Sequence, residues 1–403
     1  MELMNARGTK DFLPEQKILR QKITDVLREV FELYGYPPLE TPLIERFSVL
    51  SAKYAGGAEI LKETFNFKDQ GKRELGLRYD LTVPFSRVIA MNPRIKMPFK
   101  RYQIGRVFRD GPIKLGRMRE FWQCDVDIVG TKSMLADAEM VAIASEGFKR
   151  LGIKVVIKIN NRKVLDAVME EAKVKDAESA ILTLDKLEKI GEKGVLKEFK
   201  EKGIDGKRIL KVVKAKKLQL KNREGLDELE EMEKYLKNLN VKNYKIDYTL
   251  ARGLSYYTGT VFEVVCKEIG SSIAGGGRYD KMIGGFIGKG EFPAVGISFG
   301  LEPIFEVMKK ESKKTVADVY VISIGQLKES LKVVSQLRKE NVKCDIDFNS
   351  RSISKNLNYA NKMGIPYVVI VGEDEVKMKK YSLKDMVKGK EEKLSVSDIV
   401  KKV

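Results

Sequence analysis

The chain has 403 residues, of which 43% are apolar and 33% charged, so it is long enough for about two or three domains with hydrophobic cores, and disorder is not expected. Its formal net charge of +19 is dispersed along the chain, which indicates either attraction to a polyanion such as RNA or simply a lysine-rich solvated surface. Because there is no histidine and only three cysteines, Cys124, Cys266 and Cys344, the sequence excludes imidazole-based catalysis, histidine-ligated metals and a disulfide framework.

The first predicted element is an amphipathic helix over residues 14–34. Its apolar residues recur at helical spacing, Pro14 suits the first turn, and Gly35 follows the end. The next segment, residues 36–45, contains three prolines, so we expect it at a sheet edge or an interface. The N-terminus lacks the apolar core of a signal peptide and no apolar run approaches membrane-spanning length, so we expect a soluble, cytoplasmic protein.

A strand, a loop and a second strand are predicted over residues 101–129, where polar and apolar residues alternate. The loop, residues 110–118, contains the glycine and proline that are typical of turns. The second strand divides by parity into two faces. Its apolar face consists of Trp122, Cys124, Val126 and Ile128. Its other face is polar, which favours a site over plain solvent exposure, and consists of Arg119, Phe121, Gln123, Asp125 and Asp127.

Residues from about 160 to 245 have few aromatic side chains, many lysines and glutamates, and apolar residues at helical spacing, which predicts a helical insertion. Within it, the basic segment 208–223 suits a phosphate backbone, although a solvated helix face is the commoner explanation of such a run. Both interpretations stay open.

A charged linker at residues 309–314 leads to a separate C-terminal pattern. A strand at 316–325, a helix to about 339, a strand at 343–348, a helix at 352–363 and a strand at 366–372 alternate regularly. Such alternation predicts a small α/β domain with a largely parallel core sheet.

Several motifs, spread in order over nearly the whole chain, resemble those of histidyl-tRNA synthetases, which are class II aminoacyl-tRNA synthetases. They are GTKDFLP at 8–14, LRYDLTVP at 77–84, the region 109–130, INNRKVL at 159–165, LARGLSYYTG at 250–259, GGGRYD at 275–280 and the region 359–366. The helix and proline-bearing strand at the start also resemble the class II dimer element.

The resemblance implies an α+β fold: a class II antiparallel sheet with flanking helices, a helical insertion and a C-terminal α/β anticodon-binding domain. The implied domains are 1–159 for the first part of the catalytic domain, 160–245 for the insertion, 246–309 for the second catalytic part and 315–403 for anticodon binding. It also implies a homodimer and tRNA(His) as a partner.

The implied activity is histidine–tRNA ligation, in which histidine is activated with ATP and Mg²⁺ and passed to the 3′ end of tRNA(His). The matching catalytic residues are Arg109 and Arg252, which would hold the α-phosphate and neutralise its charge. The residues matching the ATP site also include Arg117 and Phe121, the latter stacking on adenine. The residues matching the histidine pocket are Asp80, Thr82 and Gln123 for the ammonium group, and Asp127, Tyr256 and Tyr257 for the imidazole side.

The chain departs from the family pattern at three positions. Gly111 stands where motif 2 usually has an acidic residue, Pro303 where motif 3 has an arginine, and Ser255 where an aspartate is common. For single residues, Asp80 suits a helix cap equally well, and Arg278 with Asp280 is expected to brace a turn.

Two other classes of protein remain as alternatives. One is a non-catalytic, histidine-sensing regulatory subunit of ATP phosphoribosyltransferase, which generally lacks the C-terminal domain. The other is a pure RNA-binding relative, in which Arg109 or Arg252 would be expected to be lost.

Overall fold

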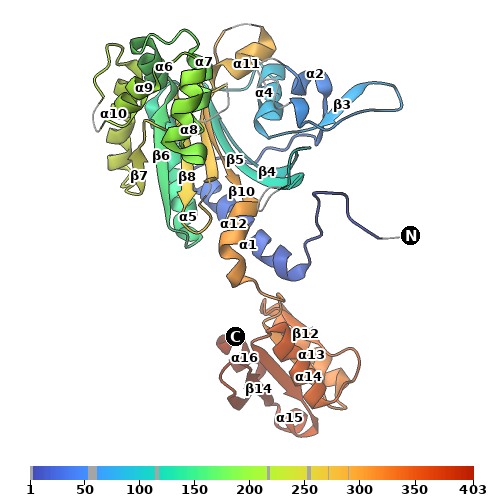
Figure 1. Cartoon of the computed structure of the whole chain (residues 1–403). Coiled ribbons are helices and arrows are strands. Elements are labelled where there is room, and N and C mark those ends of the chain that lie inside the picture. The colour runs from blue at the N-terminus through green and yellow to red at the C-terminus, as the bar shows by residue number, and fades with distance from the viewer. Residues whose placement is uncertain are drawn as a thin grey trace. The chain divides into compact units, whose positions relative to one another are not determined.

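The computed structural model describes residues 3–52, 61–113, 118–215, 218–251, 256–270, 272–288 and 290–403. By its contacts the chain divides into two compact units, shown with their elements in Figure 1. The larger unit is made of Met1–Lys10 and Lys22–Val307, and the smaller of Asp11–Gln21 and Met308–Val403. No helix among the described residues is both long enough and apolar enough to cross a membrane.

A seven-stranded sheet forms the centre of the larger unit, in the order β4-β5-β10-β9-β8-β6-β7. Neighbouring strands are antiparallel except for β6 and β7. The predicted antiparallel sheet is therefore confirmed. The strands are β4 (Phe99–Phe108), β5 (Glu120–Val129), β6 (Val155–Asn161), β7 (Tyr244–Ile246), β8 (Thr260–Cys266), β9 (Ser272–Arg278) and β10 (Ala294–Gly300).

Helices cover this sheet. On one face, Phe31 of α1 (Pro14–Leu33) and Phe148 of α5 (Met134–Arg150) both pack against Phe299 of β10. The predicted amphipathic helix is confirmed, since its apolar stripe is buried while the opposite face is exposed. Elsewhere in the unit, α4 (Thr82–Met91) packs against α11 (Asp280–Ile287), and α12 (Leu301–Met308) follows β10 directly.

The proline-bearing segment precedes a small antiparallel sheet of order β1-β3-β2. Its strands are β1 (Ile44–Arg46), β2 (Asn66–Lys68) and β3 (Glu74–Leu77), with α2 (Phe47–Leu50) after β1. Pro38 also forms an isolated bridge with Tyr102 of β4. Because β1 is an edge strand, the predicted edge position of this segment is confirmed.

Between β6 and β7 the described residues form five helices: α6 (Arg162–Glu171), α7 (Ala177–Leu184), α8 (Leu187–Glu201), α9 (Gly206–Val213) and α10 (Glu224–Asn238). Side-chain caps begin three of them, from Asn161, Asp176 and Asp205. The division of the larger unit into domains at 160 and 245 remains a prediction.

The smaller unit contains a five-stranded sheet of order β12-β11-β13-β14-β15. Strands β11 (Val319–Ser323), β12 (Cys344–Ile346) and β13 (Tyr367–Val371) are parallel, as predicted. The strands β14 (Tyr381–Asp385) and β15 (Glu391–Leu394) are antiparallel, so the sheet is less parallel than expected. The helices are η1 (Lys309–Glu311), α13 (Leu327–Lys339), α14 (Ile353–Met363), α15 (Glu373–Met378) and α16 (Val396–Lys402).

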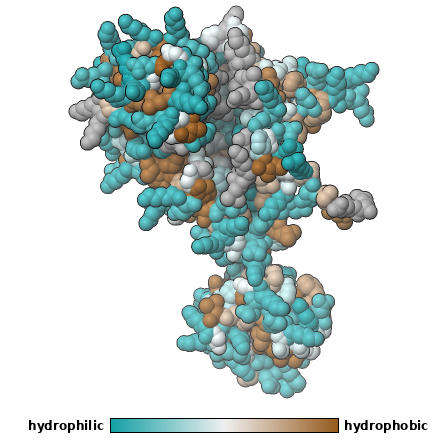
Figure 2. Space-filling view, in the orientation of Figure 1, coloured by the Kyte–Doolittle hydropathy of each residue, from teal (hydrophilic) through white to brown (hydrophobic). Residues whose placement is uncertain are grey.

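Hydrophilic residues cover most of the visible surface of the inserted helices and of the smaller unit in Figure 2. This agrees with the helix α9, whose apolar residues Ile209, Leu210 and Val213 are buried while Lys207, Arg208 and Lys211 are exposed. A basic solvated face is therefore present within the segment that the sequence analysis singled out.

Candidate active site

A cavity of about 310 Å³ opens over the strands β5, β9 and β10 of the central sheet. From β5 it receives Phe121, Gln123, Asp125 and Asp127, the alternate residues that a strand places on one face. The predicted division of this strand into two faces is therefore confirmed. Other lining residues come from the turn before α4, from the end of β4, and from the segments around β9; they include Asp80, Thr82, Arg109, Tyr256, Tyr257 and Tyr279.

The floor of the cavity is formed by glycines. Side chains approach the backbone so closely there that a residue with a β-carbon would not fit. A β-carbon on Gly296 would stand 1.9 Å from Oδ1 of Asp127. A β-carbon on Gly277 would stand 2.8 Å from the Tyr257 ring. The triple-glycine motif thus provides room for the side chains that enclose the ligand space.

Asp127 lies at the buried end of the cavity and is held by two partners that the sequence analysis missed. The Tyr279 hydroxyl donates a 2.6 Å hydrogen bond to Asp127 Oδ1. Nη2 of Arg101 lies 2.7 Å from Asp127 Oδ2. Arg101 is the register partner of Asp127 on the neighbouring strand. Tyr279 lies two residues after the triple-glycine motif, so its place in the GGGRYD sequence was a usable signal.

Three buried carboxylates, those of Asp80, Asp125 and Asp127, share this region. Burial raises the pKa of Asp125 to about 7, because the charged form is poorly solvated, and Arg101 opposes that rise. Burial likewise raises the pKa of Asp127, and again the Arg101 guanidinium acts in the opposite direction. The cavity is therefore rich in carboxyl groups and hydrogen-bond acceptors, and burial disfavours the charged forms of these carboxyls.

Three of these acceptors have no hydrogen-bond partner among the described residues: Oε1 of Gln123, Oδ1 of Asp125 and Oδ2 of Asp127, all buried. The last of these has only the ion-pair contact with Arg101. The Gln123 amide donates to Ser298 Oγ at 2.8 Å, which fixes the orientation of its side chain. A buried acceptor without a donor is costly, so these atoms indicate a ligand that brings N–H groups.

Asp80 caps the helix α4. Its Oδ1 accepts the backbone N–H groups of Thr82 and Val83, at 3.1 and 2.9 Å. The capping interpretation of this residue is therefore confirmed. The Asp80 side chain also lines the cavity, so the capping hydrogen bonds fix its position at the cavity wall.

Arg109 lies between two aromatic rings. Its guanidinium carbon is 4.1 Å from the Tyr79 ring centre and 5.0 Å from the Phe121 ring centre, and Nε donates to the Tyr79 carbonyl at 3.3 Å. An arginine and an aromatic ring thus stand together at the wall of the cavity. Arg117 and Arg252, the other two predicted arginines, and Ser255 lie outside the described residues.

The structure shows what surrounds two of the departures from the family pattern. At Gly111, a β-carbon would stand 2.7 Å from Oε1 of Glu63, so the carboxylate of Glu63 occupies the space beside this position. Pro303 lines the cavity and packs against Gly300. Among the described residues that line the cavity, Arg109 alone has a cationic side chain. None of the other lining residues therefore replaces the arginine expected at position 303.

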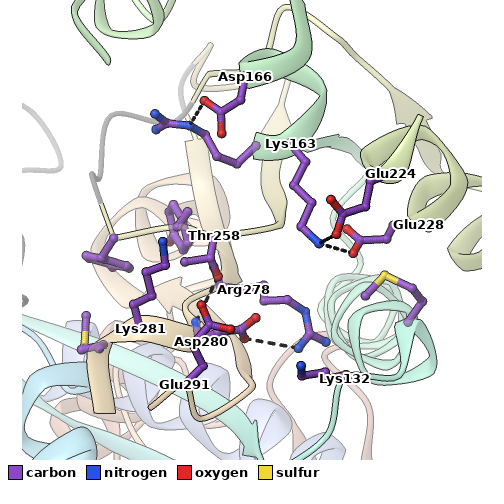
Figure 3. A pocket seen from close by; sticks show the side chains of 15 residues that line it. Lys132, Lys163, Asp166, Glu224, Glu228, Thr258, Arg278, Asp280, Lys281 and Glu291 are labelled. Carbon is purple, nitrogen blue, oxygen red and sulfur yellow. Dashed lines mark hydrogen bonds and ion pairs between the residues drawn. The ribbon is translucent and has the colours of Figure 1, made fainter. Parts of the chain in front are cut away.

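A second cavity of about 720 Å³ shares Tyr256 and Tyr257 with the first (Figure 3). Its charged side chains are largely paired: Lys163 Nζ contacts Glu224 at 2.7 Å and Glu228 at 2.5 Å. Arg278 is buried and pairs chiefly with Asp137, with Asp280 at 3.4 Å. The predicted bracing role of Arg278 is confirmed, although its main partner is Asp137. The smaller cavity, with its unpaired acceptors, is therefore the candidate active site.

The described residues contain no group of three or more histidine, cysteine, aspartate or glutamate side chains placed to hold a metal ion. The donor set that this part of the chain offers is thus not a carboxylate cage for Mg²⁺, which commonly keeps waters and substrate phosphates as its ligands.

The chain is similar to known proteins over both units. Residues 8–304 match the family model for histidyl-tRNA synthetase, and residues 318–403 match that for an anticodon binding domain. It is 45% identical to histidine–tRNA ligase 1 of Bacillus cereus over 421 residues, covering 99% of each protein. It is 46% identical to histidine–tRNA ligase 2 of Shouchella clausii, covering 98% of this chain and 99% of that protein.

Among solved structures, the histidyl-tRNA synthetase from Nostoc sp. PCC 7120 superimposes with a TM-score of 0.88 at 33% identity, covering 100% of this chain and 99% of the other. A Bacillus halodurans structure described as an ATP phosphoribosyltransferase regulatory subunit/histidyl-tRNA synthetase gives a TM-score of 0.74 at 22% identity, covering 89% of this chain and 96% of the other. The latter likeness shows the fold alone.

Proposed function

Because the chain belongs to the histidyl-tRNA synthetase family, we propose that it is an aminoacyl-tRNA ligase that activates histidine with ATP and transfers it to the 3′ end of tRNA(His). One observation in the site carries this proposal. The cavity holds buried, unpaired acceptors beside buried carboxylates, with Arg109 at its wall. Such a site fits a small ligand with a cationic amine, N–H donors on a ring, and a carboxylate for the arginine.

For histidine, we propose that Asp80, Thr82 and Gln123 bind the α-ammonium group. Asp127 accepts a ring N–H of the imidazole, and Tyr257 serves its other nitrogen, with Tyr256 beside it. Tyr279 and Arg101 keep the carboxylate of Asp127 in position. A ligand that leaves these buried groups unpaired loses roughly 10⁴-fold or more in such sites, so the pocket needs no editing reaction.

For ATP, we propose that Arg109 holds the α-phosphate together with the histidine carboxylate, which attacks the phosphorus in line. Arg252 neutralises the charge that grows on the phosphate oxygens, Arg117 helps to bind the nucleotide, and Phe121 stacks on adenine. Mg²⁺ would accompany the outer phosphates of ATP and neutralise them. The described side chains do not form a cage for the ion, so waters and the ATP phosphates would be its main ligands.

For tRNA, we propose that the C-terminal domain binds the anticodon and the inserted helices the acceptor stem. The match of residues 318–403 to the anticodon binding model supports the first assignment. The exposed basic face of α9 and the net charge of +19 support the second. We also propose that the protein works in the cytoplasm as a homodimer, as the dimer element in its sequence implies.

The regulatory-subunit alternative is less supported. The chain carries a C-terminal anticodon-binding match, and ligases 45% identical to it align over 99% of its length. The structure whose description mentions such a subunit shares only 22% of its residues with this chain.

The test is ATP–pyrophosphate exchange by the purified protein with each of the twenty amino acids in turn. We expect exchange with histidine alone. The sensing function would instead be indicated if the protein binds histidine, whether or not ATP is present, but catalyses no exchange with it.

A further inference from the structure

Arg101 connects the two ends of the candidate histidine pocket. It lies on β4 directly opposite Asp127 in the strand register, and its side chain is fully buried. Nη2 lies 2.7 Å from Asp127 Oδ2 and 3.3 Å from the carbonyl oxygen of Leu81, to which it donates. Leu81 directly follows Asp80. One guanidinium therefore links the imidazole end of the pocket to the ammonium end.

A third contact fixes the guanidinium plane. Its central carbon lies 4.4 Å from the ring centre of Phe85, which is itself buried on α4. The stack and the two polar contacts leave Arg101 a single orientation, so Asp127 faces a fixed positive charge.

Burying Arg101 at this position costs free energy, because part of its guanidinium is unsatisfied. Its Nε and Nη1 are buried and have no hydrogen-bond partner in the described part of the chain. An apolar pair of similar volume in place of a buried ion pair is often as stable or more stable. Stability therefore does not explain the arginine, and a role in the neighbouring pocket does.

The role follows from charge. Three carboxylates are buried around the pocket, and burial favours their neutral forms. A protonated Asp127 would present an O–H where the imidazole N–H needs an acceptor. The guanidinium of Arg101 favours the ionised form and lowers the pKa of Asp127 against the effect of burial.

We propose that Arg101 is a positioning residue that sets histidine specificity, because it keeps the Asp127 carboxylate ionised and aimed at the imidazole. The inference rests on the proposed histidine pocket and deepens it. Arg101 lies outside the residues that line the cavity, so it acts through Asp127. The charged and titratable groups around Asp127 are Arg101 on β4, Asp125 on β5, Asp80 before α4, Tyr279 after β9 and Tyr36 after α1.

The test compares Arg101→Gln with Arg106→Gln. Arg106 is a matched control because it lies on the same strand and also pairs with an acidic residue of β5, Glu120, but its side chain lies on the opposite face of the sheet and is exposed. The measurements are KM for histidine, KM for ATP and kcat in pyrophosphate exchange, and inhibition by L-histidinol. Histidinol keeps the imidazole and the amine but lacks the carboxylate, so it reports on the pocket without Arg109.

For Arg101→Gln we expect KM for histidine and the inhibition constant of histidinol to rise about tenfold or more, which corresponds to losing about 1.4 kcal/mol of binding free energy when the buried ion-pair partner of Asp127 is removed, with KM for ATP unchanged. Because burial raises the pKa of Asp127, the increase should shrink as the pH rises, since Asp127 then ionises without help. A merely structural role would not produce this pH dependence. An Arg101→Gln enzyme whose histidine KM and pH profile match those of Arg106→Gln overturns the proposal.

If Arg101→Gln does not fold, the same constants are measured for Arg101→Lys, and these test the proposal. A lysine keeps the charge but cannot contact Asp127 and Leu81 with one planar group, so the proposal requires a raised histidine KM with an unchanged ATP KM. An unchanged histidine KM in this variant also overturns it. Failure of the proposed function looks different, because the unsubstituted protein would then show no exchange with histidine at all.

Discussion

The carboxylate of Asp127 lies directly against the backbone of Gly296, so closely that a β-carbon at position 296 would stand 1.9 Å from its Oδ1. The Asp127 side chain cannot move away from Gly296 without losing contacts, because Tyr279 and Arg101 contact its two oxygen atoms. The glycine is therefore part of the proposed histidine pocket and not only of the sheet.

We expect Gly296→Ala to displace Asp127 and to raise KM for histidine about tenfold or more, as when a buried hydrogen bond is broken, while KM for ATP stays the same. Steady-state pyrophosphate exchange measures both constants. Gly71→Ala is the control, because the nearest atom to a β-carbon there is 3.3 Å away and lies in a side chain remote from the cavity. Equal histidine constants for the two variants would mean that Asp127 does not contact the imidazole.

The pKa of Asp125, raised by burial to about 7, predicts a pH-dependent stability. A carboxyl whose pKa is raised in the folded state stabilises the fold at low pH, and this contribution is lost as the pH rises through the folded value. Relative to Asp125→Asn, the unliganded protein should therefore lose thermal stability between about pH 5 and pH 8. Saturating histidine should reduce this loss, because its ammonium group compensates the charge. The exposed Asp374→Asn serves as control, and a constant difference in Tm across this range contradicts the prediction.

Arg109 should be essential for activation. We expect Arg109→Ala to lower kcat/KM for histidine activation by roughly 10² or more, the scale for removing an electrostatic donor from a transition state. Arg109→Lys should also fail, because an ammonium group neither forks nor stacks between Tyr79 and Phe121. The same losses are expected for Arg252→Ala. Near-normal exchange by either alanine variant removes that arginine from the mechanism.

The buried pair of Arg278 and Asp137 should be important for stability. We expect Asp137→Ala to lower the free energy of unfolding by about 3–5 kcal/mol, because it leaves an uncompensated buried guanidinium. Glu146→Ala, which removes the partly exposed partner of Arg150, should cost about 0–1 kcal/mol. Denaturant unfolding measures both. Similar losses for the two variants would show that Arg278 finds another partner.

The exposed basic face of α9 should contribute to tRNA binding. The double charge reversal Arg208→Glu with Lys211→Glu should weaken tRNA(His) binding and flatten the dependence of log affinity on log salt concentration, while histidine activation without tRNA is unchanged. Filter binding across a salt series gives the slope. If both activities fall together, these residues support folding of the helices instead.

Local patterns in the sequence predicted much of this molecule. The two faces of β5 followed from alternation alone, because parity along a strand is local information. Arg101 and Tyr279 were missed, because their relation to Asp127 depends on strand register and on a bond across 152 residues. Likewise, Arg278 was expected to pair with its neighbour Asp280, whereas its main partner lies 141 residues away on α5. The strands β14 and β15 were not predicted, since they are short and rich in charged residues.

The floor of the proposed histidine pocket is backbone, formed by the glycines of β9 and by Gly296 of β10, and this affects how the pocket can change in evolution. The depth of such a floor is set by the hydrogen-bond register of the sheet, and a slip of one residue would turn every side chain of the strand to the other face. Single substitutions can therefore alter the walls of the pocket but cannot deepen it. To accept a larger amino acid, a homologous enzyme would need substitutions in the walls around Tyr256 and Tyr257, because the backbone floor cannot be lowered. This restricts the substrate specificities that the fold can acquire through single substitutions.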